Sequence, residues 1–554
     1  MKWIADFETT TQEDDCRVWA WALLSIDEIK YYTGTNIDTF MSMVKKIGTG
    51  EIYFHNLKFD GSFILYWLFR NGYEYSKEPQ PKTFNSLISD MNQFYDIEVT
   101  WDSKTRKRKF IRFYDSAKII PLKVEEIPKA FGLDIKKLEI DYDAERGKDY
   151  MLTTQEKEYL KHDVLIVARA LRYFFEQGLN GMTIGSISLK DFKKTLPKGP
   201  KSWNDLFPMT IELDKEIRQA YKGAFTYLKW GEEGKEQGAG LVFDVNSLYP
   251  SVMYYCKLPY GRPILYKGKY EPDNIYDYYI QMFECSFELK PGKLPTLQLK
   301  KNLSFVPTEY IKSSKGEIIQ LCMTCTDMKL FFEHYECKNI TFFAGYKFKT
   351  TDKLFKPFID KWIGIKNQAT IEGNKGMRTI AKLILNNLYG KFASRPTGYS
   401  KIPYFEEGEV KYRLSEEEER PMMYVPIGAA ITAYAREKTI RSAQANYDRF
   451  LYADTDSLHL KGLEIPDNIE IDDVKLGAWK HESTFERAKF IRAKSYIEQI
   501  DGQLHVTCAG LPSRCHEQVS WDNFKLGAEY QGKLQQKKVI GGIVLKETTF
   551  KLIG

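Results

Sequence analysis

Two aspartates lie close together in a short polar stretch between apolar segments. Asp454 and Asp456 occur in Tyr-Ala-Asp-Thr-Asp-Ser at residues 452–457, between the apolar runs 450–451 and 458–460. A tight turn between two such runs predicts a β-hairpin that carries both carboxylates near its tip. Like charges this close are unfavourable without a cation, and hard divalent cations prefer carboxylate oxygens. The pattern therefore predicts a divalent metal site, with Mg²⁺ as the first candidate.

A third carboxylate is expected from a stretch far upstream. Residues 241–250 form an apolar run that delivers Asp244 and then turns through Asn-Ser-Leu-Tyr-Pro. An Asp-Thr-Asp sequence alone is also common in acidic surface turns, so the prediction depends on the two stretches together. We expect Asp244 and Asp456 to hold two metal ions, with Asp454 contributing and the backbone of Val245 beside them.

A helix is predicted over residues 358–394, and one of its faces is unusually polar. Lys382, Asn386 and Tyr389 stand at positions i, i+4 and i+7, which places them on one stripe, and Gly390 follows, where a ligand can approach the backbone. Such a stripe is poor core material, which argues against simple packing. Further positive charge comes from Lys366, Lys375 and Arg378.

The N-terminal region offers a second set of carboxylates. Asp6 and Glu8 are two residues apart in a predicted strand and share one face, and Asp60 follows where a buried strand runs into a helix. Asp163 lies on an amphipathic helix, four residues after Tyr159. Each acid alone also fits a helix cap or a surface charge, but together they suit a two-metal phosphodiesterase.

Length and composition limit the class of protein. A chain of 554 residues is expected to divide into several domains. The 81 Lys and Arg residues only slightly outnumber the 75 Asp and Glu residues, so a polyanionic ligand would have to bind to local basic patches. Eight scattered cysteines do not resemble a disulfide framework, and no apolar run reaches the roughly 20 residues of a membrane span; the nearest is 425–435. We expect an intracellular protein that does not bind membranes.

The N-terminal motifs resemble those of a known family. Asp-Phe-Glu-Thr at 6–9, Asn-Leu-Lys-Phe-Asp at 56–60 and Tyr-x-x-x-Asp at 159–163 resemble the three proofreading exonuclease motifs of family B DNA polymerases, in the form of the protein-primed branch of phages and linear plasmids. Residues 244–250, 382–390 and 452–457 resemble its polymerase motifs. The resemblance implies an α/β multidomain fold, an RNase H-like 3′→5′ exonuclease domain followed by a right-hand polymerase.

The resemblance also implies how the chain is divided. The expected parts are an exonuclease domain (1–180), a palm in two pieces (181–255 and 425–508), a first terminal-protein-region insertion (256–353), fingers (354–392), a second such insertion (393–424) and a thumb (509–554).

In the exonuclease half, the resemblance gives the four carboxylates the role of metal ligands. Tyr159 would orient the attacking water, and Lys137 matches an auxiliary lysine of the same site. The residues that would grip the single-stranded 3′ end are Thr9, Asn56 and Phe59, together with Tyr53, His55 and Ser116.

In the polymerase half, the resemblance assigns nucleotide and DNA contacts. Tyr249 would lie beneath the incoming sugar and exclude a 2′-hydroxyl, with Ser247 in the same motif. Lys382 and Lys366 would bind the phosphates, while Asn386, Tyr389 and Gly390 would lie at the nascent base pair. Residues 221–224, Tyr-Lys-Gly-Ala, resemble a linker motif in which Tyr221 and Gly223 contact the template, although Ala224 replaces its second glycine. Lys494 and Tyr496 resemble a Lys-x-Tyr motif that steadies the primer strand.

The implied activity is DNA-templated DNA synthesis from a terminal-protein primer, with 3′→5′ proofreading and strand displacement. The implied cofactors are two Mg²⁺ in each site, with Mn²⁺ as a substitute. The implied partners are primer-template DNA, a single-stranded 3′ end, dNTPs and a terminal protein with which an otherwise monomeric chain forms a heterodimer. The alternatives are a nuclease with a degenerate polymerase half, a non-catalytic nucleic-acid-binding factor and a DNA-primed family B enzyme.

We interpret the basic run 104–109 as a solvated hairpin tip and the acidic run 416–419 as a solvent-facing turn.

Overall fold

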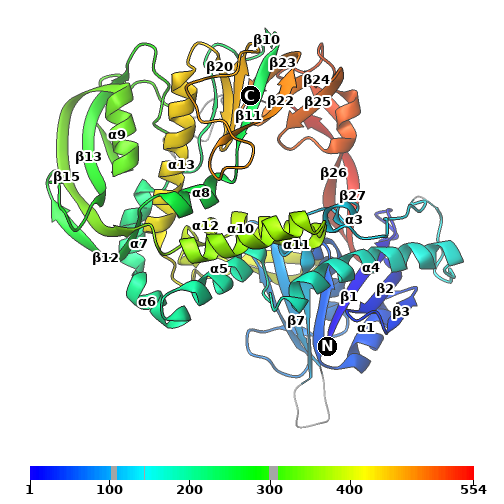
Figure 1. Cartoon of the computed structure of the whole chain (residues 1–554). Helices are drawn as coiled ribbons and strands as arrows, with labels where there is room; N and C mark the ends of the chain where they lie inside the picture. Colours follow the sequence, from blue (N-terminus) through cyan, green and yellow to red (C-terminus); the bar gives the residue numbers. More distant parts are fainter. Residues whose placement is uncertain (102–108, 143, 299–309, 554) are drawn as a thin grey trace.

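The computed structural model describes residues 1–554 apart from 102–108, 143, 299–309 and 554. The basic run at 104–109 falls, except for its last residue, outside this described part. The described residues form several separate β-sheets with different numbers of strands, and helices connect these sheets (Figure 1). None of the helices in the described ranges is long and apolar enough to cross a membrane.

The N-terminal unit is an eight-stranded mixed sheet in the order β3-β2-β1-β4-β8-β7-β6-β5. Alternation along β1 sends Asp6 and Glu8 to the face that α4 covers, whereas Phe7 packs on the opposite face, beneath α1 and α2. The strands are β1 (Lys2–Thr9), β2 (Val18–Ser25), β3 (Tyr31–Gly34), β4 (Gly50–Phe54), β5 (Glu74–Tyr75), β6 (Thr83–Ile88), β7 (Phe94–Thr100) and β8 (Phe110–Asp115). The helices are α1 (Ile37–Ile47), α2 (Leu57–Arg70), α3 (Ile127–Phe131) and α4 (Thr154–Glu176).

A five-stranded antiparallel sheet in the order β22-β11-β21-β20-β9 holds the second set of carboxylates. The apolar helix α13 (Val425–Ala445), whose alanine-rich sequence lets it pack closely, lies buried beside it with α8 (Leu248–Tyr255). The strands are β9 (Thr226–Leu228), β11 (Gly240–Val245), β20 (Phe450–Asp454), β21 (Ser457–Lys461) and β22 (Trp479–Phe485). The predicted hairpin is therefore confirmed, with Thr455 and Asp456 as its two-residue turn.

Two further sheets flank this one on either side in Figure 1. One has the order β10-β23-β24-β25 and is made of β10 (Glu236–Gln237), β23 (Arg487–Arg492), β24 (Ser495–Ile500) and β25 (Gln503–Cys508). The other has the order β12-β15-β13-β14, is covered by α9 (Cys325–His334), and is made of β12 (Leu258–Lys267), β13 (Tyr278–Leu289), β14 (Ile319–Thr324) and β15 (Tyr335–Thr351).

The segment predicted as one helix over 358–394 is instead a helical pair. α10 (Lys356–Ile371) ends where Gly373 adopts a positive φ of 68°, and the Asn374 side chain caps α11 (Lys375–Asn387) by accepting from the backbone of Met377. Gly390, expected to close the helix, lies within the short α12 (Tyr389–Phe392). α11 rests on the N-terminal unit, where Thr379 Oγ1 donates to the carbonyl of Ala130 at 2.6 Å. The preceding helices are α5 (Ile184–Thr195), α6 (Trp203–Leu206) and α7 (Ile211–Ile217).

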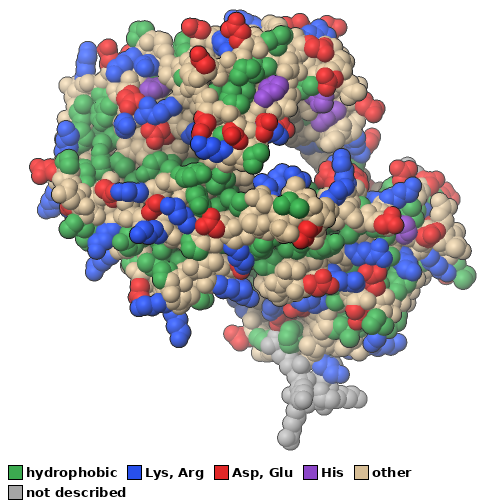
Figure 2. Space-filling model, in the orientation of Figure 1, with side chains coloured by type: hydrophobic (Ala, Val, Ile, Leu, Met, Phe, Trp, Pro, Cys, Tyr) green, Lys and Arg blue, Asp and Glu red, His purple; other side chains and the backbone are tan. Residues whose placement is uncertain are grey.

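Two hairpins, β26–β27 (Glu529–Val539, Gly542–Lys551) and β17–β18 (Lys401–Glu406, Glu409–Leu414), return to the N-terminal unit. The tip residues Val539, Ile543 and Val544 are buried in its core with Phe63. Figure 2 shows an opening between the upper sheets and helices α10 and α11, with Lys and Arg side chains along its lower edge.

The acidic run 416–419 is a solvent-facing turn only in part. Glu418 is half-buried in a short strand, β19 (Glu418–Glu419), which pairs with β16 (Thr397–Gly398). Its carboxylate also accepts from Lys77 of the N-terminal unit and from Ser400 Oγ at 3.0 Å. A basic partner from another part of the chain therefore fixes this residue, which the local sequence did not indicate.

Candidate metal centres and the cationic helix

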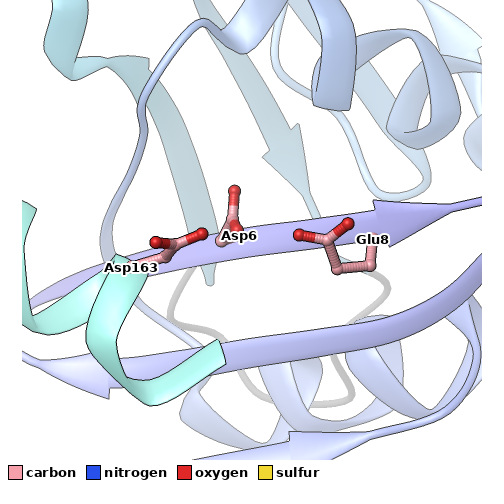
Figure 3. Close-up of side chains that lie close together, drawn as sticks. All are labelled: Asp6, Glu8 and Asp163. Atoms are coloured by element: carbon pink, nitrogen blue, oxygen red, sulfur yellow. The ribbon is translucent and has the colours of Figure 1, made fainter. Parts of the chain in front are cut away.

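The first centre joins strand β1 to helix α4. Asp6 and Glu8 from the strand and Asp163 from the helix offer carboxylate oxygens that all lie within 4.8 Å of one another (Figure 3). They line a cavity of about 180 Å³. Asp60 lies in the first turn of α2, and burial, followed by the charges of Asp6 and Glu8, raises its pKa. The structure thus brings together the four predicted acids.

Burial of these carboxyl groups destabilises their ionised forms when no cation is bound. Burial, and then the charge of Asp163, raises the pKa of Asp6 to about 7. Burial, and then the charge of Asp6, raises the pKa of Glu8 to about 8. Oδ1 of Asp60 and Oδ1 of Asp163 are buried without a hydrogen-bond partner. Buried oxygens of this kind, in a crowded acidic set, fit a divalent cation.

Two tyrosines and a lysine complete the centre. Lys137 Nζ lies 3.4 Å from Oδ2 of Asp163. The hydroxyl of Tyr159 lies 3.0 Å from that of Tyr142, and burial raises the pKa of Tyr159, which keeps its phenol protonated. Tyr142 was not among the predicted residues. Its only signal in the sequence is its position shortly after Lys137.

Three of the residues predicted to grip a 3′ end are accessible. Asn56 is exposed with φ 81°, and its backbone N–H donates to Oδ1 of Asp115 at 3.0 Å. Phe59 and Thr9 are half-buried at the start of α2 and the end of β1. These positions leave their side chains available to a ligand.

The other three residues lie deeper. Tyr53 is only 4 % exposed, and its ring stacks on that of Tyr114. Ser116 is fully buried and lies 2.9 Å from Nδ1 of His55, whose Nε2 lies 2.7 Å from the carbonyl of Leu122. Burial lowers the pKa of His55. His55 lines the cavity, whereas Tyr53 and Ser116 support the strands beneath it.

The second centre is built by adjacent strands. Asp244, on β11, lies opposite Ser457 of the hairpin and opposite Lys480 of β22. The backbone N–H of Val245 donates to the carbonyl of Asp456 at 2.8 Å. The two stretches predicted to meet, more than 200 residues apart in the sequence, are therefore hydrogen-bonded to each other.

Two of the three aspartates, Asp244 and Asp456, have a raised pKa. Burial, and then the charges of Asp456 and Glu482, raises the pKa of Asp244 to about 7. Burial, and then the charge of Asp454, raises the pKa of Asp456. Asp244 and Asp456 are consequently the pair that most requires a cation, and they fit a divalent metal. Glu482 gave no motif signal in the sequence.

Asp454 already has a positive partner. Lys494 Nζ lies 2.6 and 2.8 Å from its two carboxylate oxygens, and Thr226 Oγ1 donates to Oδ1 at 2.9 Å. Among the described residues only the Asp6 group brings three carboxylates within 4.8 Å, so the second centre is more open than the first. Lys494 adopts a φ of 56°, a left-handed conformation that aims its side chain and that sequence patterns do not reveal.

The cationic helix α11 faces this second centre. Lys382 is exposed, and its charge opposes the rise in the pKa of Asp244. Burial, then Arg378 and Lys382, lowers the pKa of Lys366 on α10. Cationic side chains from two helices therefore share one side of the centre.

The polar stripe runs from α11 into the short α12 and meets helix α8. Asn386 is exposed, and the ring of Tyr389 stacks on that of Tyr249 with centroids 3.7 Å apart and planes at 22°. A Cβ added to Gly390 would meet no atom within 4 Å. Ser247, at φ 55°, directs the chain into α8.

The remaining predicted contacts lie around the second centre. Arg436 of α13 donates to the carbonyls of Lys222 and Gly223 at 2.8 and 2.6 Å, which fixes the backbone beside Tyr221. A Cβ at Gly223 would meet open space. The ring of Tyr496 packs on that of Tyr452 with centroids 5.3 Å apart, directly below Asp454.

Two acidic centres on separate sheets, one of them facing a cationic helix pair, define an enzyme equipped for phosphoryl chemistry with divalent metals. A family profile described as DNA polymerase type B, organellar and viral, matches residues 41–155 and 139–473. The DNA polymerase of Bacillus phage phi29 is 46 % identical over 570 residues, covering 99 % of this chain and 98 % of the relative, and that of Streptococcus phage Cp-1 is 32 % identical with the same coverage.

A solved structure of phi29 DNA polymerase complexed with primer-template DNA is 44 % identical, covers 100 % of this chain and 99 % of that chain, and gives a TM-score of 0.94. The orthorhombic crystal form of the same polymerase gives 0.95. The chain belongs to the family B DNA polymerases, in the protein-primed branch of phages.

Proposed function

We propose that this DNA polymerase extends a primer at the Asp244 and Asp456 centre and trims a 3′ end at the Asp6 centre, so that it proofreads its own product. The observation that carries the proposal is the burial of two separate acidic clusters, each with raised carboxyl pKa values. Solved complexes of phi29 DNA polymerase with primer-template DNA, with nucleotide substrates and with single-stranded DNA support DNA and dNTPs as ligands.

At the synthesis centre, the primer 3′-oxygen attacks the α-phosphate of the dNTP in line, and pyrophosphate leaves. Asp244, Asp456 and the backbone carbonyl of Val245 would hold two Mg²⁺, which supply charge neutralisation for the phosphates, with Mn²⁺ as a substitute. Asp454, already paired with Lys494, contributes less directly to this charge balance.

The other residues of this centre position the substrates. Lys382 and Lys366 bind the triphosphate as fixed positive charges. Tyr249, stacked on Tyr389, offers a rigid face beneath the sugar and collides with a 2′-hydroxyl. Asn386 and Gly390 leave room at the nascent base pair, while the primer strand and the template are held by Lys494, Tyr496, Tyr221 and Gly223.

At the trimming centre, Asp6, Glu8, Asp60 and Asp163 would hold two divalent ions, which supply activation of water and stabilisation of the leaving oxygen. Tyr159, kept protonated, orients the attacking water by hydrogen bonding, and Lys137 balances the negative charge at Asp163. The 3′ end is gripped by Thr9, Asn56 and Phe59, with His55, Tyr53 and Ser116 shaping the cavity.

The proposed domains follow the sheets. The eight-stranded sheet and α4 form the exonuclease domain (1–180), the five-stranded sheet forms the palm (181–255 and 425–508), and α10 and α11 form the fingers (354–392). The sheet of β12 to β15 is the first insertion (256–353), the β17–β18 hairpin belongs to the second (393–424), and the C-terminal hairpin forms the thumb (509–554). The opening in Figure 2, beside which the C-terminal hairpin reaches the N-terminal unit in Figure 1, supports enclosure of DNA and strand displacement.

We further propose that synthesis starts on the hydroxyl of a terminal protein, with which the chain forms a heterodimer in the host cytoplasm. Incubation of the two proteins with Mg²⁺ and one labelled dNTP is expected to label the terminal protein with a single dNMP. A DNA-primed enzyme would label only an added primer, and that result would reject protein priming.

Primer extension with and without dNTPs tests the two activities on one gel. The wild-type protein is expected to shorten the primer without dNTPs and to lengthen it with them. The Asp6→Ala, Asp60→Ala variant is expected to lose shortening and keep extension. Loss of extension by a folded variant would favour a nuclease with a degenerate polymerase half, and unchanged primer in every lane would favour a non-catalytic binding factor.

A further inference from the structure

Tyr142 lines the cavity that also holds Asp6, Glu8 and Asp163, called here the trimming cavity. Because no helix or strand holds its segment in place, Tyr142 requires a contact from another residue to fix its position. Its side chain is about half exposed, at 51 %, yet its hydroxyl lies 3.0 Å from that of Tyr159. The described residues of 141–150 contain neither helix nor strand. An exposed tyrosine in such a segment holds one rotamer only if a nearby residue fixes the backbone.

Arg146 is the one described residue of 141–150 that is buried. Its Nη2 donates to the carbonyl of Asp141 at 2.7 Å and its Nη1 to the carbonyl of Ala144 at 3.2 Å, so it ties the backbone on both sides of Tyr142. Its guanidinium lies 3.9 Å from the ring of Trp19, on the strand next to β1. Arg146 thus binds the segment to the sheet that carries Asp6 and Glu8.

Glu156 connects the same arginine to helix α4. Its carboxylate accepts from Nε of Arg146 at 3.0 Å and from the hydroxyl of Tyr150 at 2.7 Å. The same carboxylate completes the capping box of α4 with Thr153. Tyr159 follows Glu156 by three residues and therefore lies on the same face of the helix, one turn further on. One ion pair consequently sets the positions of both tyrosines.

We propose that the Arg146–Glu156 pair is a positioning device for 3′-end trimming, which holds the hydroxyl of Tyr142 against that of Tyr159 so that Tyr159 is oriented toward the attacking water. The proposal rests on the proposed exonuclease activity. Arg146 and Glu156 are not among the residues that line the cavity of Asp6, Glu8 and Asp163; they act through Tyr142, which does line it. The guanidinium fork is essential because a lysine cannot bind two carbonyls and a carboxylate in this geometry.

The test is the single-turnover trimming of a labelled single-stranded oligonucleotide by Arg146→Lys, Glu156→Gln and Tyr142→Phe. Glutamine preserves the capping box, so Glu156→Gln removes the ion pair without removing the helix cap. Each variant is expected to lower the maximal trimming rate about tenfold or more while the half-saturating oligonucleotide concentration changes less than about threefold. The rate of primer extension should stay at the wild-type value.

A double variant separates positioning from a general structural effect. Because Arg146 acts through Tyr142, Arg146→Lys, Tyr142→Phe is expected to trim no more slowly than Tyr142→Phe alone. Arg172→Lys provides the matched control. Arg172 lies on α4, the helix that carries Tyr159, and it also binds a carboxylate and a carbonyl, those of Glu28 and Ile26, away from the cavity. It should leave trimming unchanged.

Four results would overturn the proposal. The first is a wild-type trimming rate in Arg146→Lys, and the second is a loss in the double variant equal to the product of the two single losses. An equal loss in Arg172→Lys would also reject it, because the effect would then be structural. Absence of trimming by the wild-type protein itself would reject the proposed exonuclease function, and the positioning role with it.

Discussion

Replacing Glu8 by glutamine is expected to stabilise the metal-free protein at alkaline pH. The Glu8 side chain is nearly buried, and burial followed by the charge of Asp6 raises its pKa from the ordinary 4.5 to about 8. A carboxyl whose folded pKa is raised is stabilising while protonated, so its contribution is complete below about pH 4.5 and is lost as the pH rises through about 8. Glutamine stays neutral and escapes this loss.

The size of the effect follows from the two pKa values. A rise from 4.5 to about 8 corresponds to an upper limit of about 4 to 5 kcal/mol in the free energy of unfolding above pH 8. Some of this energy is shared with Asp6, whose pKa is also raised, so a measured gain of about 2 to 4 kcal/mol is expected. Below about pH 4.5 the variant and the wild type should be equally stable.

The assay is urea unfolding in EDTA at several pH values between 4 and 9, followed by tryptophan fluorescence. Five of the ten tryptophans lie in the N-terminal unit: Trp3, Trp19, Trp21, Trp67 and Trp101. The difference in unfolding free energy between Glu8→Gln and wild type should grow with pH. Saturating Mg²⁺ should reduce or reverse the difference, because only the wild type retains the full ligand set. Glu158→Gln, on the exposed face of α4, serves as the control and should show no such trend.

Two outcomes would refute this reasoning. If Glu8→Gln is no more stable than wild type at pH 8.5 in EDTA, burial does not destabilise the carboxylate. If the gain is the same at pH 5 and pH 8.5, its origin is packing rather than ionisation. Either result would remove the electrostatic argument for a cation at this centre.

Three further predictions concern the synthesis centre. Lys382→Leu should slow dNMP incorporation by about a hundredfold or more while primer-template affinity, measured by fluorescence anisotropy, changes little; equal losses in both would reject a role at the triphosphate. Tyr249→Val should lower the preference for dCTP over CTP in single-nucleotide incorporation about tenfold or more, and an unchanged ratio would leave Tyr249 as a packing residue. Lys494→Ala removes the positive partner of Asp454, so the Mg²⁺ concentration for half-maximal extension should shift, and an identical Mg²⁺ titration would show that the ion pair does not tune the site.

Short-range patterns predicted the parts of each site that one strand, turn or helix determines. Alternation in β1 correctly placed Asp6 and Glu8 on one face, and the Asp-Thr-Asp turn formed the expected hairpin. The meeting of Asp244 with that hairpin was predicted from chemistry, since two aspartates on one hairpin do not complete a divalent metal site. Such predictions succeed because the relevant geometry has a period of two residues or lies within one turn.

Other contacts between distant segments, and one local break in a helical pattern, could not be read from the sequence. The break at Gly373 depends on a capping asparagine within an otherwise helical pattern, and Lys494 reaches Asp454 through a left-handed backbone conformation. Residues near the tip of the C-terminal hairpin pack in the N-terminal core, where the Cys16 thiol lies 3.5 Å from the carbonyl of Ile543. Nothing in either segment alone specifies that contact, because its energy comes from apolar surface that only the folded chain brings together.

The central claim is that two carboxylate centres in one chain lengthen and shorten the same DNA end. Its most direct test is single-nucleotide addition and 3′-end trimming by Asp244→Asn, Asp456→Asn, measured side by side with wild type at saturating Mg²⁺. The account predicts that addition falls by a factor of about a thousand or more while trimming continues at the wild-type rate. Addition at the wild-type rate by this variant would contradict the account.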